Sequence, residues 1–600
     1  MLFKKACEHL GVHRWTYEML WQVSPFYTVG MIVCSFLSGL TPILFFIALR
    51  GLIDDQLSSA GKSPMRWLGL MLFIGCIEAT VSLAQRLFRQ VLREKAVVDI
   101  NELILRQSLN KPIAFFEQSR SQDQFDKINS NCADRMVDLI SRNSQVFSST
   151  LQVITTAYVL ARIEPLVILV IPPCFVPYLW YQIKLGSSSA KEIQQRVQER
   201  RKTGYFLGML TSIQGVVETR MLGIADHLIE KFRDISSATR DKEIGKQVWQ
   251  FLASVVFAVA SVLLFFGLIG RLLYNRDSSG VTLGSIVLFT GASLRLRKSF
   301  EDATLAISSI ADHTLYLSYT MRFLSETKHK QERTLSTELC SSFYPEISFE
   351  NVTFRYDGQV QDAIKDVSFT IRPGETIAIV GENGSGKSTL VKLLAGIYQP
   401  QSGAIQISGH NISQVDLKSL HQNLAFVFQD FNRYNASLVE NVAYGNWVRY
   451  SSYTPDEQWK DLEPCVMSAG LIHEMKKMPQ AQETILGRVL GGYELSKGVW
   501  QRIAMARAYA RRAQVLIMDE PTSAIDAKAE YEMFKLIGEL SEGRTTILIS
   551  HRFTTVTMAS RIFVMESGQL VETGTHADLL QLNGRYAALY NYHRALHKNE

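Results

Sequence analysis

Residues 381–389 read Gly381-Glu382-Asn383-Gly384-Ser385-Gly386-Lys387-Ser388-Thr389. The run has the spacing G-x-x-x-x-G-K-[ST], in which backbone N–H groups and a lysine surround phosphate groups while a hydroxyl reaches Mg²⁺. The apolar residues 376–380 precede it, and a helical pattern begins near Lys387. This strand, loop and helix context is the one the motif requires. The sequence therefore predicts an ATP-binding α/β domain.

An acidic pair follows further along the chain. Asp519 and Glu520 close the apolar run 515–518, and carboxylates at the C-terminal edge of a parallel sheet lie where Mg²⁺ and phosphates bind. We expect Asp519 to lie near Mg²⁺ and Glu520 to polarise the hydrolytic water.

A third segment lies between the phosphate loop and the acidic pair, and reads Leu495-Ser496-Lys497-Gly498-Val499. The order of the three segments resembles that of ATP-binding-cassette (ABC) proteins. Their usual signature is L-S-G-G-Q, so Lys497 and Val499 depart from it. Ser496, Gly498 and the helix dipole still suit phosphate, whereas Lys497 either adds a charge contact or obstructs closure over ATP held by a partner domain.

The resemblance implies further site residues. Gln429, after the apolar run 424–428, matches the glutamine that touches Mg²⁺ and the attacking water. Residues 523–526 resemble the D-loop, and His551, after residues 545–550, resembles the histidine that contacts the γ-phosphate.

Tyr356 follows the expected first strand, 347–354, where ABC domains stack adenine, although a tyrosine at a strand end is also common for packing. The predicted catalytic residues are Glu520, His551 and Gln429. Those expected to bind ATP are Tyr356, Gly381, Glu382, Asn383, Gly384, Ser385, Gly386, Lys387, Ser388, Thr389, Ser496 and Gly498. Those expected at Mg²⁺ are Ser388, Gln429 and Asp519.

The first half of the chain is apolar. Runs long enough to cross a ~30 Å hydrocarbon core, about 20 helical residues each, predict six spans. They lie near 23–49, 66–86, 144–162, 165–183, 248–272 and 280–296. Because the first run is too long for a signal peptide and has no A-x-A site behind it, it is expected to remain as a helix.

Long polar segments separate spans two and three, and spans four and five. Their apolar residues recur three and four apart, which indicates helices that continue beyond the bilayer. About 25 residues in each direction would reach nearly 40 Å. Such hairpins resemble those of ABC exporters, whose tips dock on the ATPase domains. Residues 114–126 and 217–223 fit the tips, although ordinary helix-turn sequence explains them equally well.

Two features fall inside the spans. Pro165, Pro172, Pro173 and Pro177 remove backbone donors from span four, which predicts a kink or local unwinding. Glu78 is an acid within an apolar run. An ionisable side chain inside the membrane is costly in free energy, which favours a position of Glu78 on the translocation pathway. A paired structural carboxylate is the equal alternative.

Composition argues against several other classes of protein and site. The formal net charge of +6 over 600 residues gives little support to nucleic-acid binding. Basic residues gather in the polar stretch 184–246, as the positive-inside rule expects of cytoplasmic segments. The seven cysteines include no C-x-x-C pair, so neither a zinc site nor a disulfide framework is indicated.

We therefore expect an α-helical transmembrane domain of six spans followed by an α/β P-loop ABC domain. The expected boundaries are 1–325 for the transmembrane domain, 326–345 for a linker and 346–600 for the nucleotide-binding domain. One set of six spans and one ATPase domain make half of an exporter. The resemblance implies a homodimer or heterodimer in the cytoplasmic (inner) membrane with its ATPase domain in the cytoplasm, using ATP and Mg²⁺, with no nucleic-acid partner.

Three readings of the cargo and activity stay open. Segments 428–431, 486–488, 494–496 and 500–501 look most like bacterial lantibiotic and bacteriocin exporters, which implies a peptide cargo. No peptidase domain precedes the first span, so leader removal by this chain is not expected. The alternatives are a multidrug or lipid exporter with the same ATPase, and an ATP-gated regulator that binds without productive hydrolysis.

Overall fold

The structure is a computed structural model that describes residues 2–57, 64–117, 128, 131–187, 189–274, 282–325, 345–521, 527–550 and 552–597. It divides into two compact units. The first contains Met1–Lys111 and Phe115–Lys328, and the second contains Pro112–Ala114 and His329–Glu600. The expected linker, 326–345, lies outside the described residues except for its last position.

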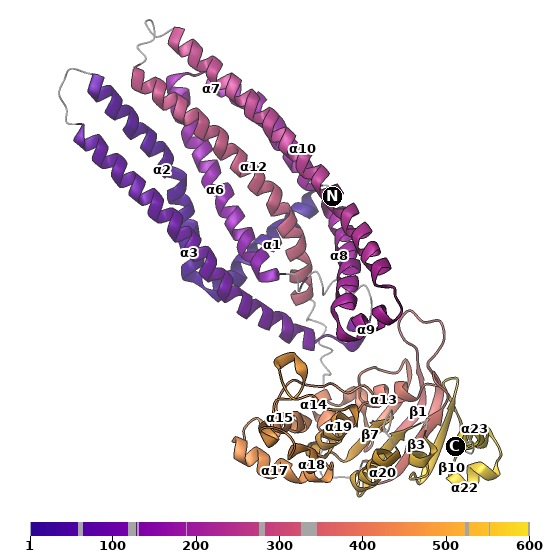
Figure 1. The fold of residues 1–600 in the computed structure, drawn as a ribbon. Helices are drawn as coiled ribbons and strands as arrows, with labels where there is room; N and C mark the ends of the chain where they lie inside the picture. Colours follow the sequence, from indigo (N-terminus) through magenta and orange to yellow (C-terminus); the bar gives the residue numbers. More distant parts are fainter. Residues whose placement is uncertain are drawn as a thin grey trace. The chain divides into compact units, whose positions relative to one another are not determined.

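The first unit is helical (Figure 1). Its helices are α1 (Leu2–Val23), α2 (Pro25–Leu57), α3 (Met65–Leu109), α6 (Cys132–Ile163), α7 (Val167–Ser187), α8 (Ser189–Thr211), α9 (Ile213–Met221), α10 (Ala225–Tyr274) and α12 (Leu283–Ser325). The short α4 (Ile113–Glu117) follows α3 and is divided between the two units after Ala114. Each of the six predicted spans falls on a separate helix, namely α2, α3, α6, α7, α10 and α12. Of these, α2, α3, α6 and α10 are apolar and long enough to cross a membrane within the described residues.

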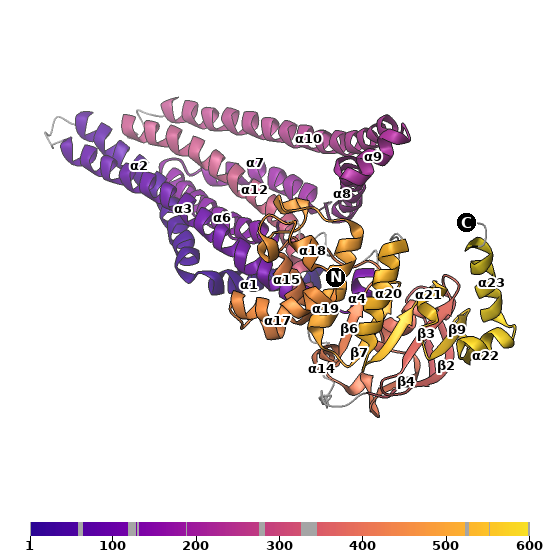
Figure 2. The ribbon, with the colours of Figure 1, turned by 60° about the horizontal axis from the view of Figure 1, so that its bottom comes forward.

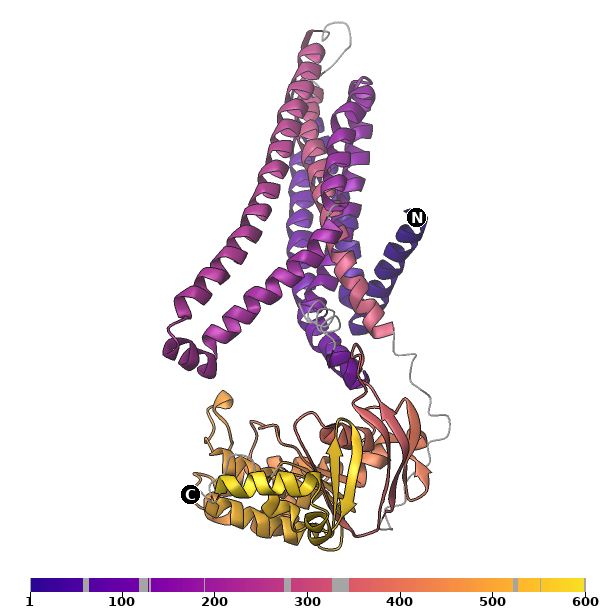
Figure 3. The same cartoon turned by 90° about the vertical axis from the view of Figure 1, so that its right-hand side faces the viewer.

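The helices that adjoin the long polar segments exceed a bilayer, as their sequence pattern predicts. The 45 residues of α3 measure about 68 Å at 1.5 Å per residue, twice a ~30 Å hydrocarbon core. The 50 residues of α10 exceed it further. Figure 3 shows α8 and α10 converging on α9, which forms the tip of this hairpin. The expected tip at 217–223 lies at the end of α9, and most of the one at 114–126 lies outside the described residues.

Local unwinding of span four is wrong for the residues described. The helix α7 is continuous from Val167 to Ser187 through three of the prolines. Pro165 precedes it, in a turn where the N–H of Val167 bonds the carbonyl of Glu164 at 3.1 Å. Pro172, Pro173 and Pro177 each remove one backbone donor, and α7 stays helical through all three.

Buried polar side chains join three of the long helices. The amide of Gln152, on α6, donates to the carbonyl of Ser38 on α2 at 2.8 Å and accepts from the hydroxyl of Ser299 on α12 at 2.6 Å. Gln152 and Ser299 are both buried. Because a buried amide without partners is costly, this pair of bonds specifies how α2, α6 and α12 pack.

The second unit is an α/β domain with two sheets. The strands are β1 (Ile347–Phe354), β2 (Ile364–Ile371), β3 (Thr376–Gly381), β4 (Ser402–Ile407), β5 (His410–Asn411), β6 (Leu424–Val427), β7 (Val515–Asp519), β8 (Thr545–Ile549), β9 (Arg561–Glu566) and β10 (Gln569–Gly574). An antiparallel sheet has the order β2-β1-β4-β5, and a larger sheet has the order β10-β9-β3-β8-β7-β6. The core strands of the larger sheet are parallel, so their C-terminal ends meet at one edge.

Helices cover the larger sheet and form a separate helical lobe (Figure 2). They are α13 (Lys387–Leu394), α14 (Leu417–Gln422), α15 (Leu438–Ala443), α16 (Trp447–Tyr450), α17 (Pro455–Ser468), α18 (Ile472–Met475), α19 (Lys497–Arg511), α20 (Ala527–Ser541), α21 (Phe553–Val556), α22 (His576–Gln581) and α23 (Arg585–His597). Apolar residues of α19 and α20 pack with the strands in one cluster, while α15, α17 and the other face of α19 share a second. The helix α19 therefore packs against both the larger sheet and the helical lobe.

Candidate nucleotide site

The phosphate loop connects β3 to α13, as its sequence predicts. Gly381 has φ 153° and Gly386 has φ 102°, conformations that favour glycine. A Cβ on Gly381 would lie 2.3 Å from the carbonyl oxygen of Met565, and one on Gly386 would lie 2.7 Å from that of Ala363. Both glycines are therefore required by the close approach of neighbouring backbone.

Lys387 is the first residue of α13, and its side chain points back into the phosphate loop. Its ammonium donates to the carbonyls of Gly381 at 2.9 Å and Glu382 at 2.8 Å, and to the hydroxyl of Ser385 at 3.4 Å. Burial lowers the pKa of Lys387, and the carboxylates of Glu520 and Asp519 oppose that shift. The loop thus holds a buried cation in position before any phosphate arrives.

The acidic pair lies at the end of β7. Asp519 is paired in register with Ile549 of β8, and the N–H of Glu520 bonds the carbonyl of Ile549 at 2.8 Å. Glu520 has φ 48°, an unusual conformation for a residue with a side chain. Strained backbone of this kind persists only where surrounding contacts hold it, and it often occurs at active sites.

Gln429 meets Glu520 in space. The strand β6 ends at Val427, one residue earlier than the sequence predicts, and Gln429 lies in the exposed loop beyond it. Its side-chain amide donates to the carboxylate of Glu520 at 2.7 Å. Because a carboxylate accepts, the NH₂ group must face Glu520, which leaves the amide oxygen of Gln429 available to a metal ion.

Tyr356 lies beside the phosphate loop in an aromatic cluster. Its hydroxyl is 3.1 Å from that of Thr389 on α13, and its ring meets Phe354 and Tyr398 edge to face with centroids 5.0 and 5.3 Å apart. Tyr356 is therefore near α13, and packing alone accounts for its position. Adenine stacking stays a prediction.

The altered signature forms the start of α19. Ser496 caps this helix by accepting from the N–H of Val499 at 3.4 Å. Lys497 is exposed, whereas Val499 is half-buried against the cluster that includes Trp500. The two departures from the usual signature therefore have different structural effects. Lys497 adds a charge to the surface, whereas Val499 packs within the domain. His551 and the D-loop residues 523–526 lie outside the described residues.

Two side-chain contacts were not predicted from the sequence. Arg585, at the start of α23, bonds the carboxylate of Glu382 in the phosphate loop at 2.6 Å. Arg507, on α19, donates to the carbonyl and side-chain oxygen of Asn441 at 2.9 and 2.7 Å. Burial lowers the pKa of Arg507 to about 10. The two residues of the Arg585–Glu382 pair lie 203 positions apart in the sequence, and those of the Arg507–Asn441 pair lie 66 apart. No local sequence pattern predicts contacts over such separations.

Comparison with known proteins decides the family. Residues 364–523 match the model of the ABC transporter family, and residues 28–297 match that of the ABC transporter transmembrane region. The chain is an ABC transporter of the exporter type. This ABC exporter hydrolyses ATP to drive transport and is a multi-pass protein of the inner membrane with a cytoplasmic ATPase domain.

The exporter has relatives along nearly its whole length. It is 26% identical to the subtilin transport ATP-binding protein SpaT of Bacillus subtilis, with 94% of this chain and 91% of the relative covered. It is 28% identical to an ATP-dependent lipid A-core flippase of Thiobacillus denitrificans, with 95% and 96% covered. Its fold is that of a bacterial Atm1-family ABC exporter with ATP bound, at a TM-score of 0.77 and 21% identity over 95% of this chain and 98% of the other. Exporters of this fold work as dimers.

Proposed function

We propose that two copies of this exporter, or one copy and a related half-transporter, move an amphiphilic peptide of the lantibiotic or bacteriocin kind out of the cytoplasm. Glu78 is the observation that carries the peptide proposal. It is exposed on α3, 13 residues after the helix begins at Met65, or about 20 Å along it. A carboxylate at that depth is costly against lipid but would attract a cationic peptide. The similarity to SpaT supports the same cargo.

The nucleotide half-site suits ATP and Mg²⁺. The phosphate loop, with Lys387, would hold the phosphates. Ser388, Asp519 and the amide oxygen of Gln429 offer hydroxyl, carboxylate and carbonyl oxygens, the donors that Mg²⁺ prefers. The metal would neutralise charge on the phosphates.

Within that half-site, Glu520 would accept a proton from the attacking water, and Gln429, bonded to Glu520 at 2.7 Å, would keep that carboxylate in position. His551 is assigned to the γ-phosphate and Tyr356 to adenine on family resemblance. Ser496 and Gly498 would complete the site of the partner.

A lipid with anionic groups is the second candidate, and charges on α12 favour it. Arg295 and Arg297 lie 12 and 14 residues beyond Leu283, about 20 Å along the helix. The Nε atom of each is buried and has no hydrogen-bond partner among the described residues, while another nitrogen of the Arg297 guanidinium lies 3.7 Å from the carboxylate of Glu301. Basic groups at that depth would suit phosphates, as in a glycolipid, and the flippase relatives are as similar as SpaT.

The two cargoes are separated by ATPase stimulation in lipid nanodiscs. We expect a cationic amphiphilic peptide with its leader to stimulate at low concentration, and Glu78→Gln to reduce stimulated ATPase more than basal ATPase. Arg297→Gln is the matched control, since it removes a charge of opposite sign at the same depth. Stimulation by a lipid A-type glycolipid that Arg297→Gln abolishes would replace the peptide by a lipid. A response to unrelated drugs alone would make the protein a multidrug exporter.

The signature departures predict slow hydrolysis wherever Ser496 closes on ATP. In a homodimer, replacing Lys497 by Gly and Val499 by Gln is expected to raise ATPase activity several-fold, because the first change removes an exposed charge at the start of α19 and the second restores an amide. In a heterodimer, whose partner would bring one degenerate site, the gain is expected to be small. Mass determination of the intact complex identifies the assembly. Lower activity of the double variant in a homodimer would refute the prediction.

A further inference from the structure

Glu382 places a negative charge on the phosphate loop, to which ATP would add more. It is the second residue of the loop, and its side chain is 64% exposed. Its carbonyl accepts from the ammonium of Lys387 at 2.8 Å and from the N–H of Ser385 at 3.2 Å. The backbone of Glu382 is therefore part of the loop that would hold the phosphates, while its carboxylate carries the same sign of charge as they do. Like charges repel, so an unbalanced Glu382 would weaken ATP binding.

Arg585, the first residue of α23, supplies the opposite charge. Its guanidinium donates to the carboxylate of Glu382 at 2.6 Å and lies 3.1 Å from the carboxylate of Glu566, the last residue of β9. Among the residues that the structure describes, Glu382 has no other cationic partner. The counter-charge of Glu382 thus comes from a helix at the far end of the domain sequence and not from the loop itself.

The backbone at the start of α23 holds Arg585 in place. The two carboxylate oxygens of Glu572, on β10, accept from the N–H groups of Arg585 at 2.5 Å and Tyr586 at 3.0 Å. A Cβ on Gly584 would lie 2.2 Å from one of these oxygens, so the absence of a side chain there permits the close approach. Exposed ion pairs are weak when both side chains must first be ordered. Here the backbone of one partner is already fixed, which lowers that cost.

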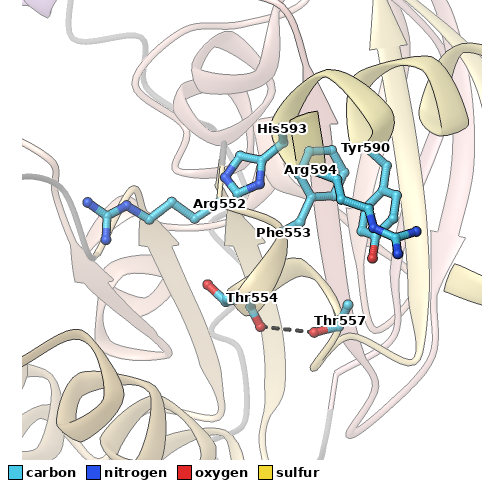
Figure 4. A pocket seen from close by; sticks show the side chains of 7 residues that line it. All are labelled: Arg552, Phe553, Thr554, Thr557, Tyr590, His593 and Arg594. Atoms are coloured by element: carbon cyan, nitrogen blue, oxygen red, sulfur yellow. Dashed lines mark hydrogen bonds between the residues drawn. The ribbon is translucent and has the colours of Figure 1, made fainter. Parts of the chain in front are cut away.

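Aromatic packing fixes the rest of α23. Phe553 of α21 packs edge to face on Tyr586, Tyr590 and His593, with centroids 5.5, 5.2 and 5.3 Å apart. Figure 4 shows the rings of Phe553, Tyr590 and His593 grouped together. Tyr586, next to Arg585, is fully buried. Arg585 is therefore presented to Glu382 by a packed helix and not by a free chain end.

The phosphate loop and α23 are attached to the same hairpin. In the β9–β10 turn, the N–H of Gly568 bonds the carbonyl of Ser385 in the loop at 3.2 Å. Glu566 ends β9 just before that turn, and Glu572, which holds the start of α23, lies on β10. The hairpin therefore sets the position of Arg585 relative to Glu382.

We propose that Arg585 is a positioning residue of the nucleotide site, which holds Glu382 and offsets its charge so that the phosphate loop and Lys387 receive ATP without repulsion from that carboxylate. The affinity for ATP then depends on α23, which lies outside the loop. The proposal goes beyond export itself, and it rests on the proposed function only in assigning the phosphate loop to ATP.

The test measures the affinity of the full-length protein in nanodiscs for a non-hydrolysable ATP analogue with Mg²⁺. Arg585→Gln is expected to weaken binding about threefold at low ionic strength, because solvent and ions screen the repulsion from Glu382. The KM for ATP is expected to rise by a similar factor, with a smaller change in kcat. In about 0.5 M salt the difference from the wild-type protein is expected to shrink.

A double-mutant cycle assigns the effect to Glu382. In the Glu382→Gln background, Arg585→Gln is expected to change the affinity hardly at all, because the carboxylate that needs a counter-charge is gone. Arg585→Lys keeps the charge and is expected to bind the analogue within about a factor of two of the wild-type protein. Equal weakening by Arg585→Gln in the wild-type and Glu382→Gln backgrounds would overturn the proposal, since Arg585 would then act on the fold alone.

Two further variants complete the experiment. Arg594→Gln, which removes an exposed cation from the same helix, is the matched control and is expected to bind the analogue as the wild-type protein does. Lys387→Ala tests the phosphate loop separately. Unchanged binding in Lys387→Ala would remove ATP from the loop, and with it the proposed function of that site. Loss of binding in Lys387→Ala with unchanged binding in Arg585→Gln would overturn the role of Arg585 alone.

Discussion

Glu520→Gln is expected to retain ATP while its turnover falls by about 100-fold or more. The carboxylate lies at the end of β7, held in a left-handed conformation at φ 48° and bonded by Gln429 at 2.7 Å. Glutamine preserves the size of the side chain but cannot accept the proton of the attacking water. Steady-state ATPase assays and nucleotide binding on the same preparation measure both quantities.

The control for this change is Glu542→Gln, which alters an exposed glutamate beyond α20. It is expected to hydrolyse ATP at the normal rate. Hydrolysis at the wild-type rate in Glu520→Gln would remove this residue from the chemistry, and loss of ATP binding would show that it acts on the nucleotide itself.

Lys387→Ala is expected to weaken ATP binding by at least about tenfold, because it removes a charge-assisted bond to the phosphates. The same ammonium bonds two carbonyls of the loop at 2.9 and 2.8 Å. Its loss would therefore also leave those carbonyls without a donor. Equilibrium binding of a fluorescent ATP analogue measures the effect.

Lys418→Ala, at an exposed lysine of α14, is the matched control and is expected to bind ATP normally. Unchanged affinity in Lys387→Ala would contradict the assignment of the phosphate loop. A low melting temperature in Lys387→Ala alone would indicate that its role in the empty loop outweighs its role in binding.

The helical unit could be predicted largely from its sequence because the bilayer imposes length and polarity on each span. Each of the six expected runs overlaps a separate helix, and the helices adjoining the polar segments extend beyond bilayer length. Span four was predicted wrongly in one respect. The sequence shows that three prolines remove backbone donors from this span, but it does not show that the remaining hydrogen bonds keep α7 continuous from Val167 to Ser187.

The nucleotide site was predictable where its residues follow one another along a strand and loop. The phosphate loop and the acidic pair are local patterns, and parallel pairing of β7 with β8 and of β8 with β3 brings them to one edge. The Arg585–Glu382 pair could not be predicted, because it depends on how β9, β10 and α23 return to the loop. The bond between Gln429 and Glu520 likewise depends on the order of strands in the sheet.

The most direct test of ATP-driven export is accumulation of a labelled peptide in inside-out proteoliposomes. Wild-type protein is expected to accumulate the peptide against a gradient only when ATP and Mg²⁺ are present, and Glu520→Gln is expected to accumulate almost none while still binding ATP. Equal accumulation by the two proteins, or accumulation without ATP, would contradict export driven by hydrolysis at Glu520. ATP binding with no accumulation of peptide, glycolipid or drug by the wild-type protein would favour an ATP-gated regulator.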